Sequence, residues 1–238
     1  RWFFTIFPAE YTGEFYRTVF NHRLTRTGIV NSLMLSSVST LVDVVLGFAI
    51  GFFLARTRLK GRQILDLLVM LPLAIPGIVV SFGYFSLFSN TPLDPRNNPM
   101  VLLVISYSIR RLPYLVRSTY SSFQQLSESL EEASYSVGAS VMTTFRRITF
   151  PLVSPGLFAG GVLAFSFSVM EVSSSLILAV RERHYPIAKV IYTVAGRITD
   201  GPYVACALGV LGMALVGLSY YASSRLVARK IGEFFKIG

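Results

Sequence analysis

The chain alternates between long apolar runs and shorter polar connections. Five runs are long and apolar enough to cross a bilayer as helices, which takes about 20 residues. They are residues 28–55, 64–88, 100–120, 155–180 and 203–227. We therefore predict an all-α membrane protein with one transmembrane domain over residues 1–238.

The two short connections predict the orientation in the membrane. Residues 56–63, "RTRLKGRQ", gather four basic side chains, whereas residues 89–99, "SNTPLDPRNNP", set Arg96 against Asp94. Short loops rich in Lys and Arg stay in the cytoplasm, so the first loop is predicted to be cytoplasmic and the second outside. By alternation, residues 121–153 and the C-terminal tail lie inside, and residues 1–27 and 181–202 lie outside.

The outer segments have a pattern of their own. "AEYTGEFYRTVFNHRL" (9–24) and "YPIAKVIYTVAGRI" (185–198) space their aromatic and aliphatic residues as amphipathic surface helices do. Within the spans, Pro72, Pro76 and Pro113 are predicted to kink their helices.

Composition supports the membrane and argues against nucleic acid. The chain is 53% hydrophobic and 14% charged, with a formal net charge of +10. The basic residues sit at the ends of apolar runs, as membrane topology requires, and do not form a basic face with interleaved aromatics. We expect contact with lipid and no nucleic-acid partner.

One cytoplasmic stretch is polar, "EEASYSVGASVMTTFRRITFP" (131–151). Ser129 followed by Glu132 forms a capping-box pattern, which predicts a short helix starting near Ser129. Gly138 is predicted to end it, because glycine tolerates the left-handed conformation that turns the chain. Ser140 then offers the N-cap of a second helix.

The second helix is predicted to close at Pro151, with Ser154 and Pro155 as N-cap and first position of the next span. The result is a helical hairpin in the cytoplasm. Its small residues leave the backbone approachable, which suits a helix laid into a partner's groove.

The spacing within this hairpin carries a resemblance to a known family. It reads Glu-Ala-Ser, three residues, Gly, nine residues, Ile, one residue, Phe-Pro. This pattern resembles the EAA loop of binding-protein-dependent ABC importer permeases, with Ser134 in place of the second Ala and Phe150 in place of Leu. The residues that match are Glu132, Ala133, Ser134, Gly138, Ile148 and Pro151.

The resemblance implies a fold and a set of partners. The fold is the five-helix core of the type I, MetI-like importer permease, often preceded by one further helix. Because the chain begins with Arg1, we expect such an N-terminal part to be missing. The loop would dock into a cytoplasmic ABC ATPase dimer. The other implied partners are an extracytoplasmic solute-binding protein and a second permease subunit or copy, in the inner membrane of a bacterial or archaeal cell.

No catalytic role is expected for this chain. It contains no Gly-Lys dipeptide and hence no Walker A phosphate loop, so ATP hydrolysis is expected in the partner subunit. No cofactor and no metal site are expected either, since in this family a separate binding protein does most of the solute selection.

Charged residues inside the spans need a partner or a purpose. Asp43 lies near the middle of the first span, at a depth similar to that of Arg110 and Arg111 in the third. Two interpretations stay open: an interhelical ion pair that orients the bundle, or a polar wall of the translocation path.

A second polar group lies in the fourth span. Glu171 is followed by Ser173, Ser174 and Ser175, a surface that lipid would not tolerate. We favour a role in the translocation path or its gate over a purely structural role.

The identity of the transported solute is the most detailed part of the prediction. Residues 170–192, "MEVSSSLILAVRERHYPIAKVIY", most resemble permeases of the ferric-iron uptake group. Sulfate, molybdate, thiamine, phosphonate and polyamine systems are the alternatives. Two other classes stay open: a secondary transporter or channel, which leaves the hairpin unexplained, and a membrane-anchored scaffold, which leaves the buried charges unexplained.

Overall fold

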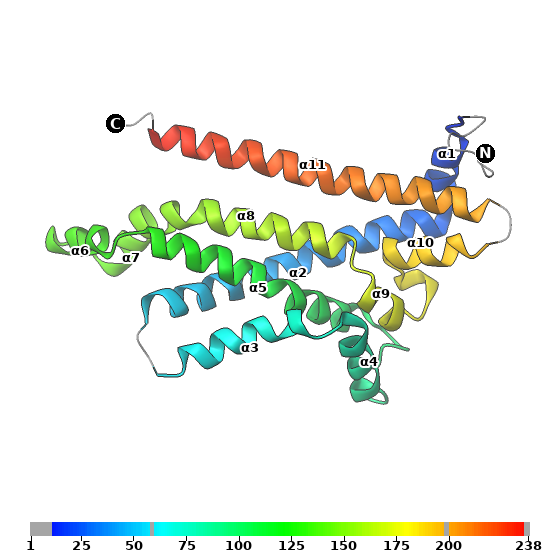
Figure 1. Ribbon diagram of the computed structural model, residues 1–238, viewed down its shortest axis with the longest axis horizontal. Helices are drawn as coiled ribbons and strands as arrows, with labels where there is room; N and C mark the ends of the chain where they lie inside the picture. The colour runs from blue at the N-terminus through cyan, green and yellow to red at the C-terminus, as the bar shows by residue number, and fades with distance from the viewer. Residues whose placement is uncertain (1–10, 58–59, 198–199, 236–238) are drawn as a thin grey trace.

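The computed structural model describes residues 11–57, 60–197 and 200–235, and these residues form helices joined by short connections. Long helices run along the molecule and form a bundle (Figure 1). The four longest are α2 (Arg23–Arg56), α5 (Met100–Gln125), α8 (Phe150–Val169) and α11 (Gly201–Phe235). The all-α prediction is confirmed.

Helix α5 is the centre of the bundle, with α2 and α8 packed against it. Small residues allow the close approach. A Cβ atom added at Gly47 of α2 would lie 2.5 Å from the Cβ of Leu115, and one at Gly160 of α8 would lie 2.9 Å from the Cβ of Ser118. The glycines therefore set the distance between α5 and its two neighbours.

The second predicted span is broken into two helices. Helix α3 (Arg62–Ala74) and helix α4 (Gly77–Phe88) meet at a bend of 100°. The kink expected at Pro76 is confirmed, since Pro76 has no N–H to continue the ladder and Ile75 before it is extended. Pro72 and Pro113 instead lie inside helices α3 and α5.

The fourth predicted span starts earlier than expected and is also broken. Helix α7 (Val141–Thr144) passes through a π turn (Phe145–Thr149) straight into α8, which ends at Val169. The predicted stop at Pro151 is wrong, because the N–H of Phe150 bonds back to Phe145 O and the widened turn gives the proline ring room. Ser154 and Pro155 lie within α8. After Met170, helix α9 (Ser173–Leu178) starts anew.

Three helices of the described residues are long and apolar enough to cross a membrane, and the bent pair α3–α4 could add a fourth crossing. They are Arg23–Arg56, Val141–Val169 and Gly201–Tyr221. Helix α5 falls outside this group, since its middle carries Arg110 and Arg111. Its apolar residues Leu102, Leu115 and Val116 are buried in the bundle, and the Arg111 side chain is only 11% exposed, so the bundle shields this charge from lipid.

The connections between the spans alternate between the two ends of the bundle, as the sequence predicts. The α2–α3 connection and the hairpin that contains α6 (Glu128–Ser136) and α7 lie at one end, with the C-terminal end of α11 on the same side (Figure 1). At the other end lie α1 (Glu14–Asn21), α4, α9 and α10 (Ile187–Ala195). Within the segments 9–24 and 185–198 the predicted helices are confirmed as α1 and α10, but Ile187, Val190 and Val194 of α10 are buried in the bundle. Residues 9, 10 and 198 lie outside the described residues.

Candidate functional site

The hairpin of α6 and α7 begins two residues earlier than predicted. The N-cap is Ser127, whose Oγ accepts the N–H of Ser129 at 3.3 Å, so Ser129 is not the capping residue. Ser127 has the extended backbone that an N-cap needs. Glu132 consequently lies in the second turn of α6 and is exposed.

The predicted glycine turn is confirmed. Gly138 has φ +85°, a left-handed conformation that favours glycine. The N–H of Gly138 donates to Tyr135 O at 2.9 Å and that of Ala139 to Ser134 O at 3.1 Å, which together form a Schellman cap. Ser140 then caps the second arm as expected, accepting the N–H of Thr143 at 3.2 Å.

Two side-chain hydrogen bonds hold the arms of the hairpin together. Ser134 Oγ lies 2.9 Å from Thr144 Oγ1, and Thr149 Oγ1 donates to Glu131 Oε1 at 2.7 Å. Ser134, which departs from the alanine of the resembling pattern, thus has a local role. Neither bond was predicted, because each partner comes from the other arm.

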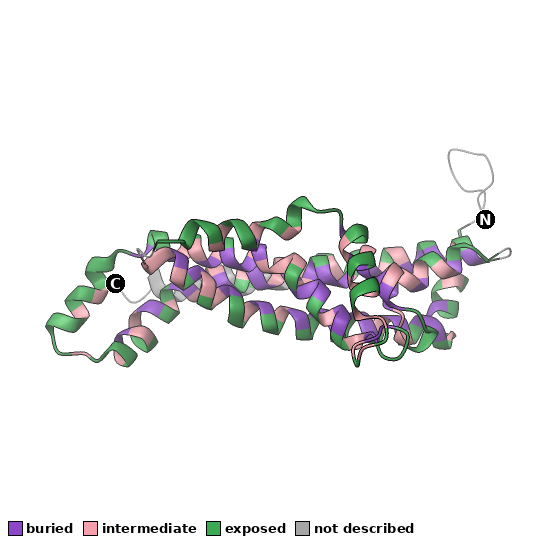
Figure 2. Cartoon of the chain, turned by 90° about the horizontal axis from the view of Figure 1, so that it is seen from below, coloured by how far each residue is buried: buried purple, intermediate pink, exposed green. Residues whose placement is uncertain are grey.

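The tip of the hairpin is apolar and open. Val137 is 85% exposed, Val141 72% and Met142 62%, next to the exposed Ala133. Figure 2 shows the hairpin reaching beyond the bundle with few buried positions. Ile148 and Pro151 are half-buried at its base. Exposed apolar side chains around a rigid turn are typical of a docking surface.

The predicted buried charges are paired differently than expected. Arg111 of α5 forms an ion pair with Glu171, at the break between α8 and α9, and its Nη2 also donates to Phe167 O at 3.3 Å. Asp43 is fully buried, yet neither carboxylate oxygen has a hydrogen-bond partner among the described residues. The predicted ion pair between Asp43 and Arg110 or Arg111 is therefore not formed.

The serines after Glu171 hold the break in place from inside. Ser174 Oγ lies 2.6 Å from Ser106 Oγ of α5 and accepts from Ser81 Oγ of α4 at 3.1 Å. Ser175 Oγ lies 2.7 Å from Tyr107 Oη. Ser174 and Ser175 thus tie α9 to α4 and α5 and face the interior of the bundle.

Arg110 and Ser173 lie at the bend between α3 and α4 and are partly exposed. Arg110 Nη1 donates to Ile75 O at 3.3 Å. A Cβ at Gly77 would lie 2.7 Å from Arg110 Cζ and 2.9 Å from Ser173 Cβ, so both side chains cover the start of α4. No carboxylate pairs with Arg110 within the described part of the chain.

A groove that the sequence did not predict runs between α5, α6 and α8, with a volume of about 640 Å³. Its polar lining comes from Ser118, Ser121, Ser122 and Gln125 of α5. The hydroxyl-rich run "STYSS" (118–122) was the available signal. Together with Arg110, this lining gives α5 a polar side at the edge of the bundle.

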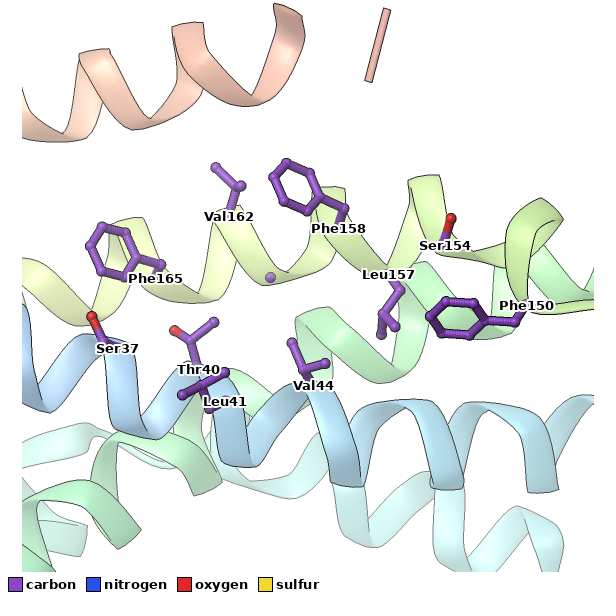
Figure 3. A pocket seen from close by; sticks show the side chains of 11 residues that line it. Ser37, Thr40, Leu41, Val44, Phe150, Ser154, Leu157, Phe158, Val162 and Phe165 are labelled. Atoms are coloured by element: carbon purple, nitrogen blue, oxygen red, sulfur yellow. The ribbon is translucent and has the colours of Figure 1, made fainter. Parts of the chain in front are cut away.

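A second groove, of about 490 Å³, lies between α2 and α8 (Figure 3). Leu41 and Val44 of α2 line it together with Leu157, Phe158 and Phe165 of α8, and Leu157 points toward Val44. Apart from three hydroxyl groups its lining is apolar and carries no charge.

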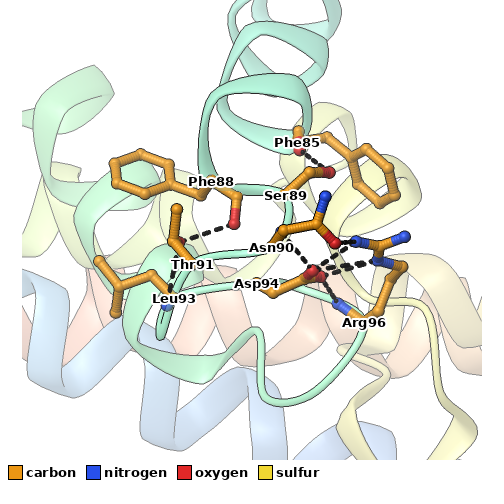
Figure 4. A network of polar contacts seen from close by, with 8 residues as sticks. All are labelled: Phe85, Phe88, Ser89, Asn90, Thr91, Leu93, Asp94 and Arg96. Atoms are coloured by element: carbon orange, nitrogen blue, oxygen red, sulfur yellow. Dashed lines mark hydrogen bonds and ion pairs between the residues drawn. The ribbon is translucent and has the colours of Figure 1, made fainter.

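The loop between α4 and α5 is held by an ion pair between Asp94 and Arg96 (Figure 4). Arg96 Nε donates to Asp94 Oδ1 at 2.9 Å, and the N–H of Asn90 donates to Asp94 Oδ2 at 2.8 Å. The hydrogen bond from Arg96, followed by that from the Asn90 backbone, holds the pKa of Asp94 well below its ordinary value. The loop is thus ordered by one carboxylate.

In the part of the chain that the structure describes, no three His, Cys, Asp or Glu side chains form a metal-binding group. The arrangement offers a hairpin with an exposed apolar tip at one end, a buried Arg–Glu pair in the middle and a polar side along α5.

Comparison with known proteins agrees with this geometry. The chain is 31% identical over 166 residues to a probable molybdenum ABC transporter permease of Haloferax volcanii, covering 68% of this chain and 62% of that protein. It is 29% identical to a ferric transport system permease of Actinobacillus pleuropneumoniae over 76% of this chain, but spans only 26% of that protein.

A solved structure of the inward-facing MetNI methionine ABC transporter has the same fold. It superimposes with a TM-score of 0.71 at 18% identity, over 92% of this chain and 99% of that chain. Residues 47–233 match the family described as "Binding-protein-dependent transport system inner membrane component". The chain belongs to this family.

Proposed function

We propose that this chain is the transmembrane permease subunit of an ATP-driven importer whose energy comes from a separate cytoplasmic ATPase. The hairpin carries this proposal, because it extends beyond the bundle, exposes an apolar tip and turns on a glycine with positive φ. A secondary transporter or channel gives such a hairpin no purpose. A membrane-anchored scaffold gives no purpose to the buried Arg111–Glu171 pair.

The ATPase docks on the hairpin in this proposal. Its contact surface comprises Glu132, Ala133, Ser134 and Gly138 at the tip, with Ile148 and Pro151 at the base. Two permease subunits, either two copies or a homologue, pair over two ATPases. Closure of the ATPase pair moves the hairpins, and the bundles rock between inward-facing and outward-facing states.

The translocation path runs along the polar side of α5. Arg110, Ser173 and the groove lined by Ser118, Ser121 and Gln125 are open to a passing solute. Glu171, Ser174, Ser175 and Asp43 are buried, so their proposed role is to hold the wall of the path or its gate. A solute-binding protein delivers the solute at the end formed by α1, α4 and α10.

Ferric iron is the first candidate solute, from the resemblance of residues 170–192 and the ferric permease among the relatives. A tetrahedral oxyanion such as molybdate or sulfate is the second candidate. It is favoured by the guanidinium of Arg110, which no carboxylate of the described residues neutralises.

The test is co-expression of the chain with a cytoplasmic ABC ATPase and a solute-binding protein from the same genome. Purified complexes are assayed for ATP hydrolysis stimulated by binding protein loaded with ferric iron, molybdate or sulfate. Gly138→Pro cannot adopt the required positive φ, so stimulation should be lost in that variant and in Glu132→Ala/Gly138→Pro. If no ATPase co-purifies with the wild type, the importer proposal is rejected and the secondary-transporter alternative is favoured.

A further inference from the structure

Arg56, the last residue of α2, reaches into the hairpin. Its Nη2 donates to Leu126 O at 3.1 Å, its Nη1 lies 3.4 Å from Glu128 Oε1, and its Nε lies 3.6 Å from Glu131 Oε2. The Arg56 side chain is only 11% exposed. One guanidinium thus contacts three successive parts of the segment that leads into and forms α6.

Glu131 extends this contact to the other arm. Its Oε2 faces Arg56, while its Oε1 accepts the hydroxyl of Thr149, a buried residue of the π turn at the base of α8. The series Arg56–Glu131–Thr149 therefore joins the end of α2, the first arm of the hairpin and the second arm.

An aromatic layer supports the same junction from the membrane side. Arg56 Cζ lies 5.7 Å from the ring centroid of Phe123, which itself packs against Phe52 of α2 at 5.4 Å. Phe48 of α2 packs against Phe145 of the π turn at 5.9 Å. Movement of the hairpin relative to α2 would have to break both this aromatic packing and the contacts between Arg56, Glu131 and Thr149.

A simpler explanation is that Arg56 only complements the C-terminal end of its own helix, as cations often do. All three of its polar partners, however, belong to residues 126–131 and none to α2. Its burial also sets it apart from exposed ion pairs, which contribute little. Arg117 with Asp66 is such a pair, at 50% and 35% exposure.

We propose that Arg56 is a positioning residue, which together with Glu131 and Thr149 fixes the hairpin to α2 so that hairpin movement is passed directly to that helix. The proposal rests on the proposed docking of an ATPase on the hairpin. Coupling between distant sites needs contiguous contacts that move as a unit. Without this junction the hairpin is attached to the bundle through its own chain ends and the aromatic layer, and part of its movement is lost before it reaches α2.

The test uses the full complex of permease, ATPase and binding protein in proteoliposomes. Uptake of radiolabelled ferric iron, molybdate or sulfate, whichever the wild type carries, is measured together with ATP hydrolysis. Arg56→Gln should keep the ATPase bound but lower uptake per ATP hydrolysed by about fivefold or more. Arg56→Lys keeps the charge without the planar fork and should recover only part of the loss.

Two further variants separate positioning from folding. Thr149→Val keeps the shape of the side chain but removes the hydroxyl that holds Glu131, so it should lower the same ratio. Arg117→Gln breaks an exposed ion pair away from the hairpin and should leave the ratio unchanged. Wild-type uptake per ATP in both Arg56→Gln and Thr149→Val would overturn the proposal.

Binding of the ATPase distinguishes this inference from the proposed function. Loss of ATPase binding in Arg56→Gln alone would also overturn it, because Arg56 would then shape the docking surface and not transmit movement. If the wild-type chain itself binds no ATPase, the proposed function fails and this inference fails with it.

Discussion

The buried pair of Arg111 and Glu171 is stable because each charge has the other as its counter-charge. Glu171 is 4% exposed and its partner's side chain 11%. Glu171→Gln leaves the guanidinium buried without a counter-charge, so the free energy of unfolding should fall by about 3–5 kcal/mol. Chemical unfolding in detergent micelles measures the change.

A double variant provides the control for that measurement. Arg111→Met/Glu171→Met removes both charges and keeps the volume apolar, so it should lose less stability than Glu171→Gln alone. A double variant that is no more stable than the single one would contradict the account that the loss in Glu171→Gln comes from the unpaired charge of Arg111.

Asp94 predicts a pH dependence of the loop between α4 and α5. Its folded-state pKa is lowered, so its contribution is fully present above the ordinary carboxylate pKa of about 4 and is lost only as pH falls through the lower folded value. The protection of the amides of residues 89–99 against hydrogen exchange, relative to their intrinsic rate at each pH, should therefore persist down to mildly acidic pH. In Asp94→Asn the loop should exchange faster already at neutral pH, and equal exchange in both proteins would contradict this account.

Side-chain partners close in sequence could be predicted, and those across helices could not. Asp94 with Arg96, and Ser140 with Thr143, follow from spacing alone. The partner of Arg111 depends on where α8 ends, and that end is itself a product of packing. The expected pairing with Asp43 failed for this reason.

Helix packing around α5 depends on Gly47. The Cβ of Gly47→Ala would meet Leu115 at 2.5 Å, so α2 or α5 must shift, at a cost of about 1–3 kcal/mol in unfolding free energy. Gly83→Ala in α4 is the matched control, because nothing lies within 4 Å of the added Cβ. It should be neutral or stabilise by up to about 1 kcal/mol. Thermal unfolding of both variants in one detergent decides, and equal effects would reject the packing account.

The two helix breaks differ in how far the sequence reveals them. The bend before α4 is marked by Pro76. The break at residues 170–172 contains neither Gly nor Pro, and it accompanies the hydrogen bonds of Ser174 and Ser175 to α5. The π turn before α8 is equally hidden, because Pro151 predicts a stop and only the wider turn allows the helix to continue.

For the whole molecule, helix α2 is one continuous element whose side chains contact both the hairpin and the segment before α10. In its N-terminal part Asn31 Nδ2 donates to Arg183 O at 3.0 Å and to Tyr185 O at 3.1 Å, just before α10. Asn31 and Arg56 lie 25 helical steps apart, or about 38 Å at 1.5 Å per residue. The alternation of loops between the two ends was predictable from charge, but this connection was not, since an Asn within an apolar run has no visible partner.

If α2 carries movement between the two ends, Asn31 should matter for the binding protein as Arg56 does for the ATPase. Asn31→Ala should reduce the stimulation of ATP hydrolysis by solute-loaded binding protein by about fivefold, with basal hydrolysis unchanged. Asn97→Ala, an exposed residue at the same end, should have no effect. Because both changes interrupt one series of contacts, Asn31→Ala/Arg56→Gln should lose little more stimulation than the worse single variant. Additive losses would mean that the two ends communicate through separate elements. Helix α2 would then support the bundle without transmitting movement between its ends.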